Sequence, residues 1–229
     1  KTIVVDDTDH SSLEIFLYRF TASLIFTPDS FSKRLGHNHI SYSGSHELSY
    51  LSTKYFTPDN KILELLGLES DEKFILVRLV DTFSALHDKS LKFNKNNSKD
   101  KISLILKLAS HYPLFISSEI PLPHQLENYS IKIPPEKIHD ALSYASLFLS
   151  ESTTMGMEAS ALGTPSILIY PKKTLGVVNF IEDYEIMTRM NSWSEFNYES
   201  CSELLNFDKK IWTTKSKMLI NENSNLTDT

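Results

Sequence analysis

The sequence contains little glycine, almost no cysteine and no long apolar run. Only 6 of its 229 residues are glycine, and Cys201 is the single cysteine, which excludes an intramolecular disulfide framework. No stretch approaches the ~18 consecutive apolar residues that a membrane-spanning helix requires, and no signal-peptide pattern is present. We therefore expect a soluble, cytoplasmic protein without a transmembrane segment, in which membrane contact is at most peripheral.

The charge balance excludes one large class of partners. The formal net charge is -6 at pH 7, whereas a nonspecific grip on nucleic acid needs a basic surface. A hydrophobic content of 41% and a charged content of 23% are ordinary for a globular protein of one large or two small domains. Residues 2–5 already have a strand pattern, so we expect the chain to start part-way through a larger protein.

Short apolar runs alternate with helical patterns along most of the chain. Near the N-terminus a helix is predicted to place Leu13, Phe16, Leu17 and Phe20 on one face. Residues 31–58 lack a clear period and are predicted to connect two domains. Strands separated by helices predict an α/β protein with a doubly wound parallel sheet. The strands are expected at residues 2–5, 23–27, 74–80, 114–117, 130–133, 147–149 and 166–169, and the main helices at 12–20, 59–68, 102–111, 136–145, 155–162 and 177–186.

A hydroxyl-rich turn lies between one predicted strand and the next helix. Ser152, Thr153 and Thr154 stand where a doubly wound sheet binds ligands, against a helix N-terminus with unpaired N–H groups and partial positive charge. This suits a diphosphate. Glu158, about one helical turn further on, suits the paired hydroxyls of a ribose. The alternative is that the hydroxyls only cap the helix and that Glu158 is solvated.

These residues also carry a resemblance to a known superfamily. The pattern of Ser152, Glu158-Ala159, Gly163 and Pro165 between two strands is similar to the C-terminal domain of GT-B fold sugar-nucleotide enzymes, which include glycosyltransferases and nonhydrolysing UDP-GlcNAc 2-epimerases. The resemblance implies that the turn binds the diphosphate and that Glu158 holds the ribose. That superfamily usually has Ser-Gly-Gly at the turn, whereas this chain has Thr153-Thr154 after the serine.

Further segments resemble a GT-B-like family of archaea and bacteria whose function is unknown. They are D-D-T-D-H at residues 6–10, Y-S-G-S-H-E-L-S-Y-L at 42–51, R-L-V-D-T-F-S-A-L-H-D at 78–88 and I-P-P-E-K-I-H-D at 133–140. The resemblance implies two facing Rossmann-like domains, with residues 1–58 ending the first and connecting it to the second, at 59–229, and with roughly one hundred residues of the first preceding Lys1. It also implies that the loop with Pro135 and His139 contacts the nucleotide base.

Acidic residues cluster after the first predicted strand. Asp7, Asp9 and His10 are candidate catalytic residues, because one of them could deprotonate an acceptor hydroxyl. Two carboxylates at this spacing could instead bind Mg²⁺ or Mn²⁺, although GT-B enzymes commonly act without a bound metal, and we expect no metal or cofactor. The third possibility is a helix cap with solvated loop charges.

Arg78 is predicted inside a buried strand, where an unpaired charge is expensive. It is therefore expected to bind either a ligand phosphate or a carboxylate of Asp81, Asp88 or Glu119. The remaining residues that are expected to reach the same cleft are His46, Glu47, His87, Asp88 and Glu119.

The resemblance implies a protein that binds a sugar nucleotide, most simply a UDP-sugar, and transfers the sugar to a saccharide or lipid-linked acceptor during surface-polysaccharide synthesis. An epimerase would share the donor site but need no acceptor. A noncatalytic nucleotide-sugar-binding partner subunit is the third hypothesis, favoured by Thr153-Thr154 in place of two glycines. Fold analogy alone establishes no chemistry.

Overall fold

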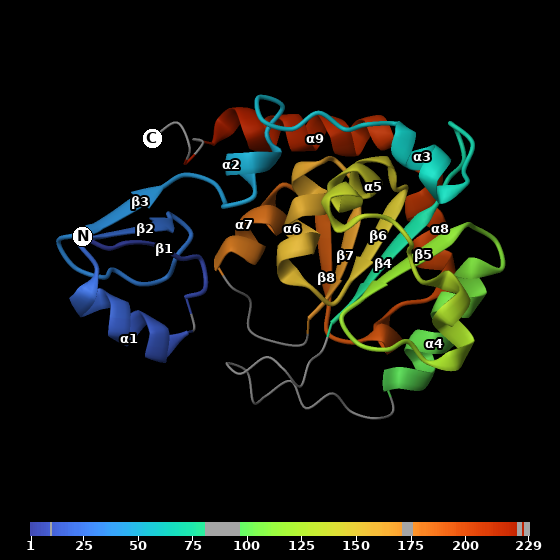
Figure 1. The fold of residues 1–229 in the computed structure, drawn as a ribbon, viewed down its shortest axis with the longest axis horizontal. Coiled ribbons are helices and arrows are strands. Elements are labelled where there is room, and N and C mark those ends of the chain that lie inside the picture. Colours follow the sequence, from blue (N-terminus) through green and yellow to red (C-terminus); the bar gives the residue numbers. More distant parts are fainter. Residues whose placement is uncertain (10, 81–96, 171–175, 224–225, 227–229) are drawn as a thin grey trace.

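The computed structural model describes residues 1–9, 11–80, 97–170, 176–223 and 226. It contains a three-stranded and a five-stranded sheet, both fully parallel, with the smaller one formed by the N-terminal residues (Figure 1). The predicted α/β class with a parallel, doubly wound sheet is confirmed. The domain boundary near residue 58 remains a prediction.

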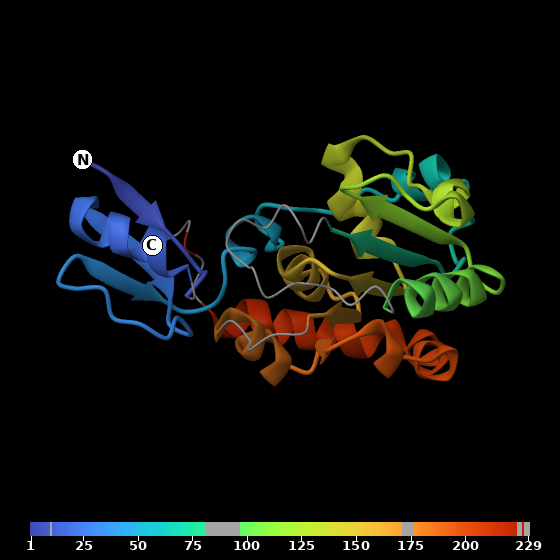
Figure 2. The same cartoon turned by 90° about the horizontal axis from the view of Figure 1, so that it is seen from below.

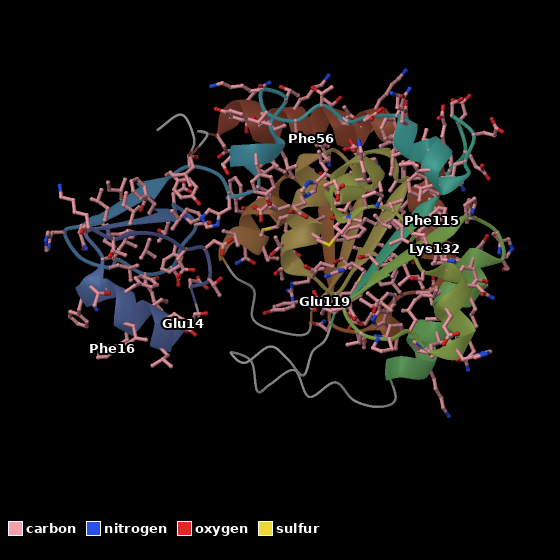
Figure 3. All side chains as sticks on the ribbon, in the orientation of Figure 1. Glu14, Phe16, Phe56, Phe115, Glu119 and Lys132 are labelled. Atoms are coloured by element: carbon pink, nitrogen blue, oxygen red, sulfur yellow. The ribbon has the colours of Figure 1, made fainter. Side chains whose placement is uncertain are left out.

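The small sheet has the order β1-β2-β3, with β1 at Ile3–Val5, β2 at Leu24–Pro28 and β3 at His39–Tyr42. Helix α1 (Ser12–Thr21) joins β1 to β2 and buries Ile15 against this sheet. The predicted apolar face of α1 exists, but Phe16 and Phe20 are 61% and 72% exposed, and Phe16 projects away from the sheet (Figure 3). The helical spacing therefore predicted the helix correctly but does not identify its buried face.

The large sheet has the order β5-β4-β6-β7-β8. The chain enters it in the middle and winds outward in both directions, as a doubly wound sheet does. Its central strands are apolar on both faces, because helices cover both sides. Their bounds are Ile75–Leu79 (β4), Leu114–Ser118 (β5), Leu147–Ser150 (β6), Ser166–Ile169 (β7) and Met187–Met190 (β8).

Two layers of helices enclose the large sheet (Figures 1 and 2). One face packs against α4 (Asn97–Ala109) and α8 (Tyr198–Asn206), around buried residues such as Ile105 and Leu108. The other face packs against α3 (Lys61–Leu66), α5 (Ile138–Tyr144) and α6 (Thr153–Ala161). Helices α7 (Gly176–Asp183) and α9 (Lys209–Glu222) extend this second layer and share a core with α6.

Several contacts among the described residues join the small sheet to the rest of the chain. Helix α2 (Leu48–Leu51) follows β3 and buries Leu48 and Leu51 in the core that α6, α7 and α9 share. The residue after α9, Asn223, lies beside the residue after β3, Ser43. The Ser43 hydroxyl donates a hydrogen bond to Asn223 Oδ1 at 2.8 Å. Gly176, the first residue of α7, approaches the backbone of Ser30 so closely that a Cβ atom would lie 1.9 Å from the carbonyl oxygen.

Two expectations from the sequence are wrong in detail. Residues 130–133 do not form a strand: Ser130 makes one isolated bridge with Ile116, and the turn η2 (Pro135–Lys137) soon follows. Conversely, β3 lies in a stretch predicted as a connection, and β8 directly follows the predicted helix at 177–186, where no strand was predicted. Both are short edge strands with partly exposed residues, so neither has the apolar pattern of a buried strand.

None of the helices in the described part of the chain is long and apolar enough to cross a membrane.

Replacing Gly176 with alanine is predicted to lower the free energy of unfolding by roughly 3 kcal/mol, the upper part of the range for overpacking. The reason is the clash of the new Cβ with the backbone of Ser30, which cannot move without shifting the small sheet. Urea denaturation would measure the change. Gly67→Ala is the matched control, because φ is +71° at this position and no atom lies within 4 Å of a Cβ. This variant should lose only about 1 kcal/mol of unfolding free energy, from the strain of a side chain in the left-handed region. Equal stability of the two variants would contradict the close approach.

Candidate functional site

The turn between β6 and α6 joins a fully buried strand to a capped helix. All four residues of β6 are buried, and Ser152 is the N-cap of α6. The Ser152 hydroxyl accepts a hydrogen bond from the N–H of Met155 at 3.4 Å, which is the capping role that the sequence allowed. The N–H groups of Thr153 and Thr154 belong to the first turn, which has no intrahelical acceptor for them. The turn therefore retains a positive helix end beside two threonine hydroxyls.

Gly156 lies where α6 packs closely against the sheet. A Cβ atom at this position would lie 3.2 Å from Met187 Sδ and 3.8 Å from Leu168 Cδ1, so the glycine lets α6 lie close to β7 and β8. The buried carbonyl of Gly156 accepts hydrogen bonds from the hydroxyls of Ser160 and Ser166 at 2.9 and 3.2 Å. These contacts fix the start of α6 against the sheet, and with it the position of the hydroxyl turn.

Glu158 is a buried carboxylate held by two neighbouring helices. Only 8% of the residue is exposed, although it lies one turn beyond the start of α6. Tyr50 of α2 donates its hydroxyl to Glu158 Oε1 at 2.9 Å, and Nε2 of His139 in α5 lies 3.1 Å from the same oxygen. The sequence predicted neither contact, because Tyr50 is 108 positions away from Glu158 and its segment, residues 42–51, carries no signal for this partner.

Arg78 lies at the carboxyl end of β4, beside Ser150 of β6 on one side and Ser117 of β5 on the other. Its guanidinium donates to Ser117 Oγ at 2.7 Å and to Glu119 Oε1 at 2.5 Å. Figure 3 shows Glu119 at the edge where these strands end. The predicted pairing with Glu119 is therefore observed, while Asp81 and Asp88 lie outside the described residues. The Nε atom of Arg78 is buried without a hydrogen-bond partner in the described part of the chain.

Glu151 is a residue at this turn that sequence reasoning missed. Its side chain is 2% exposed and forms an ion pair with Lys101 of α4 at 2.7 Å. It also accepts hydrogen bonds from Trp193 Nε1 at 2.9 Å and from the N–H of Val80 at 3.2 Å. A glutamate directly after a buried strand was the only signal in the sequence. The three donors keep the charge paired and fix the segment that leads into the hydroxyl turn.

The acidic residues after β1 reach the connection that follows β3. Asp7 Oδ2 lies 3.2 Å from Nδ1 of His46. Burial raises the pKa of Asp7, but the hydrogen bond and charge of His46 outweigh burial and lower it. Asp9 accepts a hydrogen bond from the N–H of Ser32 at 3.4 Å. The predicted site residues His10, His87 and Asp88 lie outside the described residues.

Helix α2 connects the two groups of candidate residues. His46 and Glu47 directly precede α2, and Tyr50 within it contacts Glu158. The strands of the small sheet run toward the large sheet, so their acidic ends point to this connection (Figure 1). Pro135 is the first residue of η2, the turn that leads into α5 and His139. Whether any of these residues binds a ligand remains a prediction.

No group of three or more His, Cys, Asp or Glu side chains in the described ranges is placed to hold a metal ion.

The fold is that of GT-B sugar-nucleotide enzymes. The structure of Staphylococcus aureus MnaA with UDP matches 98% of this chain with a TM-score of 0.59 at 15% identity. A putative UDP-N-acetylglucosamine 2-epimerase from Listeria monocytogenes matches 98% of it with a TM-score of 0.60 at 12% identity. This chain covers 63% of each of those chains. The resemblance that the sequence motifs predicted is thus confirmed for the fold.

The chain belongs to the family described as "Protein of unknown function (DUF354)", whose model matches residues 25–218. Its relative MJ0665, an uncharacterized protein of Methanocaldococcus jannaschii, is 31% identical over 173 residues. The match includes 71% of this chain and 48% of the relative, so this chain spans about half the length of that protein. The predicted membership in a GT-B-like family of unknown function is confirmed.

Glu47 provides a test of the electrostatics near the acidic residues. It is 1% exposed, and burial raises the pKa of its carboxyl to about 7. Because the folded chain holds this proton more tightly than the unfolded chain, the contribution of Glu47 to stability falls as pH rises from about 4.5 to about 7. Glu47→Gln, which cannot ionise, is predicted to become more stable than wild type over that interval. The difference should level off above it at about 3 kcal/mol, given about 1.4 kcal/mol for each step of one in pKa.

Urea unfolding of both proteins across this pH interval would measure the difference. Glu203→Gln, at an exposed position of α8, should show no comparable pH-dependent gain. A Glu47→Gln difference that stays constant with pH would contradict a shifted carboxyl in the folded state.

Proposed function

We propose that the protein binds a nucleoside diphosphate sugar at the β6–α6 turn and transfers the sugar to a saccharide or lipid-linked acceptor. One observation carries the proposal: a buried carboxylate, Glu158, is held in place one helical turn beyond a capped helix N-terminus. The sugar nucleotide is a substrate, and no further cofactor is part of the proposal.

The diphosphate would lie against the start of α6. Backbone N–H groups and the helix dipole favour an anion there, and the hydroxyls of Thr153 and Thr154 add donors. The guanidinium of Arg78, at the neighbouring strand end, is paired with Glu119, but its buried Nε donor finds no acceptor among the described residues. Such an unmet donor costs about 1–3 kcal/mol, so a phosphate oxygen that accepted from it would stabilise the complex.

The ribose would lie against Glu158. Tyr50 and His139 both contact Oε1, and the second oxygen, Oε2, is then the acceptor for ribose hydroxyls. A carboxylate whose orientation is already fixed loses little entropy when it accepts these bonds. The MnaA structure of similar fold was determined with UDP, which supports a uridine nucleotide as the first candidate.

The chemical step of a transfer needs two further groups. Charge develops on the departing diphosphate, where the helix donors and Arg78 would stabilise it. The acceptor hydroxyl must lose a proton, and the residues predicted for that role from the sequence are Asp7, Asp9 and His10 after β1, of which Asp7 lies near His46.

An epimerase is the second candidate function. The Listeria protein of similar fold is described as a putative UDP-N-acetylglucosamine 2-epimerase, which favours this alternative. The two activities differ in one requirement, because only a transferase consumes an acceptor. The third hypothesis, a noncatalytic binding partner, rests on Thr153-Thr154 and predicts binding without turnover.

Calorimetric titration with UDP, GDP and CMP tests the donor site. We expect one nucleotide, UDP, to bind selectively and Glu158→Ala to weaken it by about 10- to 100-fold, which corresponds to the loss of hydrogen bonds to a charged group. The exposed Glu203→Ala should bind like wild type. The ribose contact predicts that 2′-deoxy-UDP binds wild type more weakly than UDP does, and that Glu158→Ala no longer distinguishes the two. Absence of binding by all three nucleotides would contradict the proposal and make the turn a plain helix cap.

A further inference from the structure

Four buried polar side chains lie directly at and after the end of β3 without the partners that burial demands. His46 Nε2, Glu47 Oε2 and the hydroxyls of Tyr42 and Ser45 are inaccessible to solvent and have no hydrogen-bond partner among the described residues. Tyr42 and Glu47 are 4% and 1% exposed as whole residues. Buried polar groups are nearly always hydrogen-bonded, so a concentration of exceptions within six consecutive residues points to a ligand or a catalytic role.

The imidazole of His46 is held in a defined orientation. Its Nδ1 faces Asp7 Oδ2 at 3.2 Å, and the ring of Tyr42 stacks on it with centroids 6.0 Å apart and planes inclined by 23°. A carboxylate at Nδ1 keeps the proton there when the ring is neutral, which leaves Nε2 with its lone pair. In other catalytic sites, too, a third group hydrogen-bonds to a general base and orients it toward its substrate.

We propose that His46 accepts the proton of the attacking hydroxyl through Nε2 and that Asp7 is its positioning residue. This inference rests on the proposed function and assigns its proton transfer to a particular atom. The hydroxyl proton moves to Nε2, and its oxygen forms a bond to the anomeric carbon of the sugar. The bond from that carbon to the diphosphate breaks, the electron pair leaves with the nucleoside diphosphate, and His46 then releases the proton to solvent.

The surroundings of His46 fit this role. Burial by itself lowers the pKa of His46, but the hydrogen bond and charge of Asp7, aided by the charges of Glu47 and Asp6, raise it above the ordinary value. A stronger base results. Glu47 and Tyr42 offer further polar atoms to sugar hydroxyls. The His46 side chain is 26% exposed, although its Nε2 atom is covered by neighbouring protein atoms. A substrate hydroxyl that reaches Nε2 would have to displace these neighbouring atoms.

The position of His46 also joins it to the nucleotide site. It precedes Tyr50 by four residues, and Tyr50 contacts Glu158. In a donor with its ribose at Glu158 and its diphosphate at the start of α6, the sugar lies beyond the diphosphate, and the inference places this sugar beside His46. The inference therefore requires that the sugar of the donor, and not the nucleotide alone, affects this imidazole.

The first experiment is ¹⁵N NMR of histidine-labelled protein with UDP, UDP-GlcNAc and UDP-glucose, after calorimetry has established UDP binding. His46→Gln assigns the resonance among the 8 histidines. We expect at least one UDP-sugar to shift the Nε2 signal of His46 in a way that UDP does not. If UDP binds and no UDP-sugar adds to its effect, the inference is wrong while the proposed function stands. If UDP does not bind, both are wrong.

The second measurement is the rate of UDP release from the UDP-sugar that shifts His46, with water as the acceptor. We expect His46→Gln to lower this rate about 100-fold or more while UDP affinity stays within twofold. Asp7→Asn should also lower it, and should move the acid limb of the pH–rate profile to lower pH, because the imidazole loses its neighbouring charge. The exposed His124→Gln is the control and should match wild type. If the acid limb of the Asp7→Asn profile stays at the wild-type pH, the role of Asp7 as a positioning residue is wrong and the Asp7–His46 contact is only a structural ion pair.

Discussion

The close packing of α6 against the large sheet is the constraint on which the remaining structure depends. Gly156 lets the helix approach β7 and β8, and two serine hydroxyls satisfy its carbonyl. From this position α6 shares a core with α7, α9 and α2 and directs Glu158 at α2 and α5. The same packing places its N-terminus at the end of β6. A helix held farther from the sheet could present neither the hydroxyl turn nor the carboxylate in these places.

Some polar groups inside the protein have hydrogen-bond partners that stabilise the fold, whereas others keep a buried polar atom without a partner in the described structure. Glu151 has three donors and links the turn to α4 and Trp193, and the partly buried Lys209 donates its ammonium to the carbonyls of Ser143 and Ala145. In contrast, Arg78, His46 and Glu47 each keep at least one buried polar atom without a partner in the described structure. These three lie near strand ends or the segment leading into α2. Fully paired groups stabilise, whereas incompletely paired groups at strand ends are where ligands complete the hydrogen bonding.

The sequence predicted the large sheet well because its strands are buried on both faces and read as continuous apolar runs, as Leu147–Ser150 does. It could not predict β3 and β8, since partly exposed edge strands carry no such pattern. The hydroxyl turn was found from local residues alone. The contacts of Glu158 with Tyr50 and of Asp7 with His46 were not, because they join positions far apart in the chain. Local chemistry is thus readable from sequence, whereas the pairing of distant side chains requires the fold.

The central claim is that the start of α6 and Glu158 together bind a nucleoside diphosphate. A crystal structure of the protein with UDP would test it most directly. The account predicts phosphate oxygens within hydrogen-bond distance of the N–H groups of Thr153 and Thr154, and a ribose hydroxyl on Glu158 while Tyr50 and His139 keep their contacts with Oε1. A diphosphate bound at another part of the fold, with Glu158 contacting only Tyr50 and His139, would contradict it.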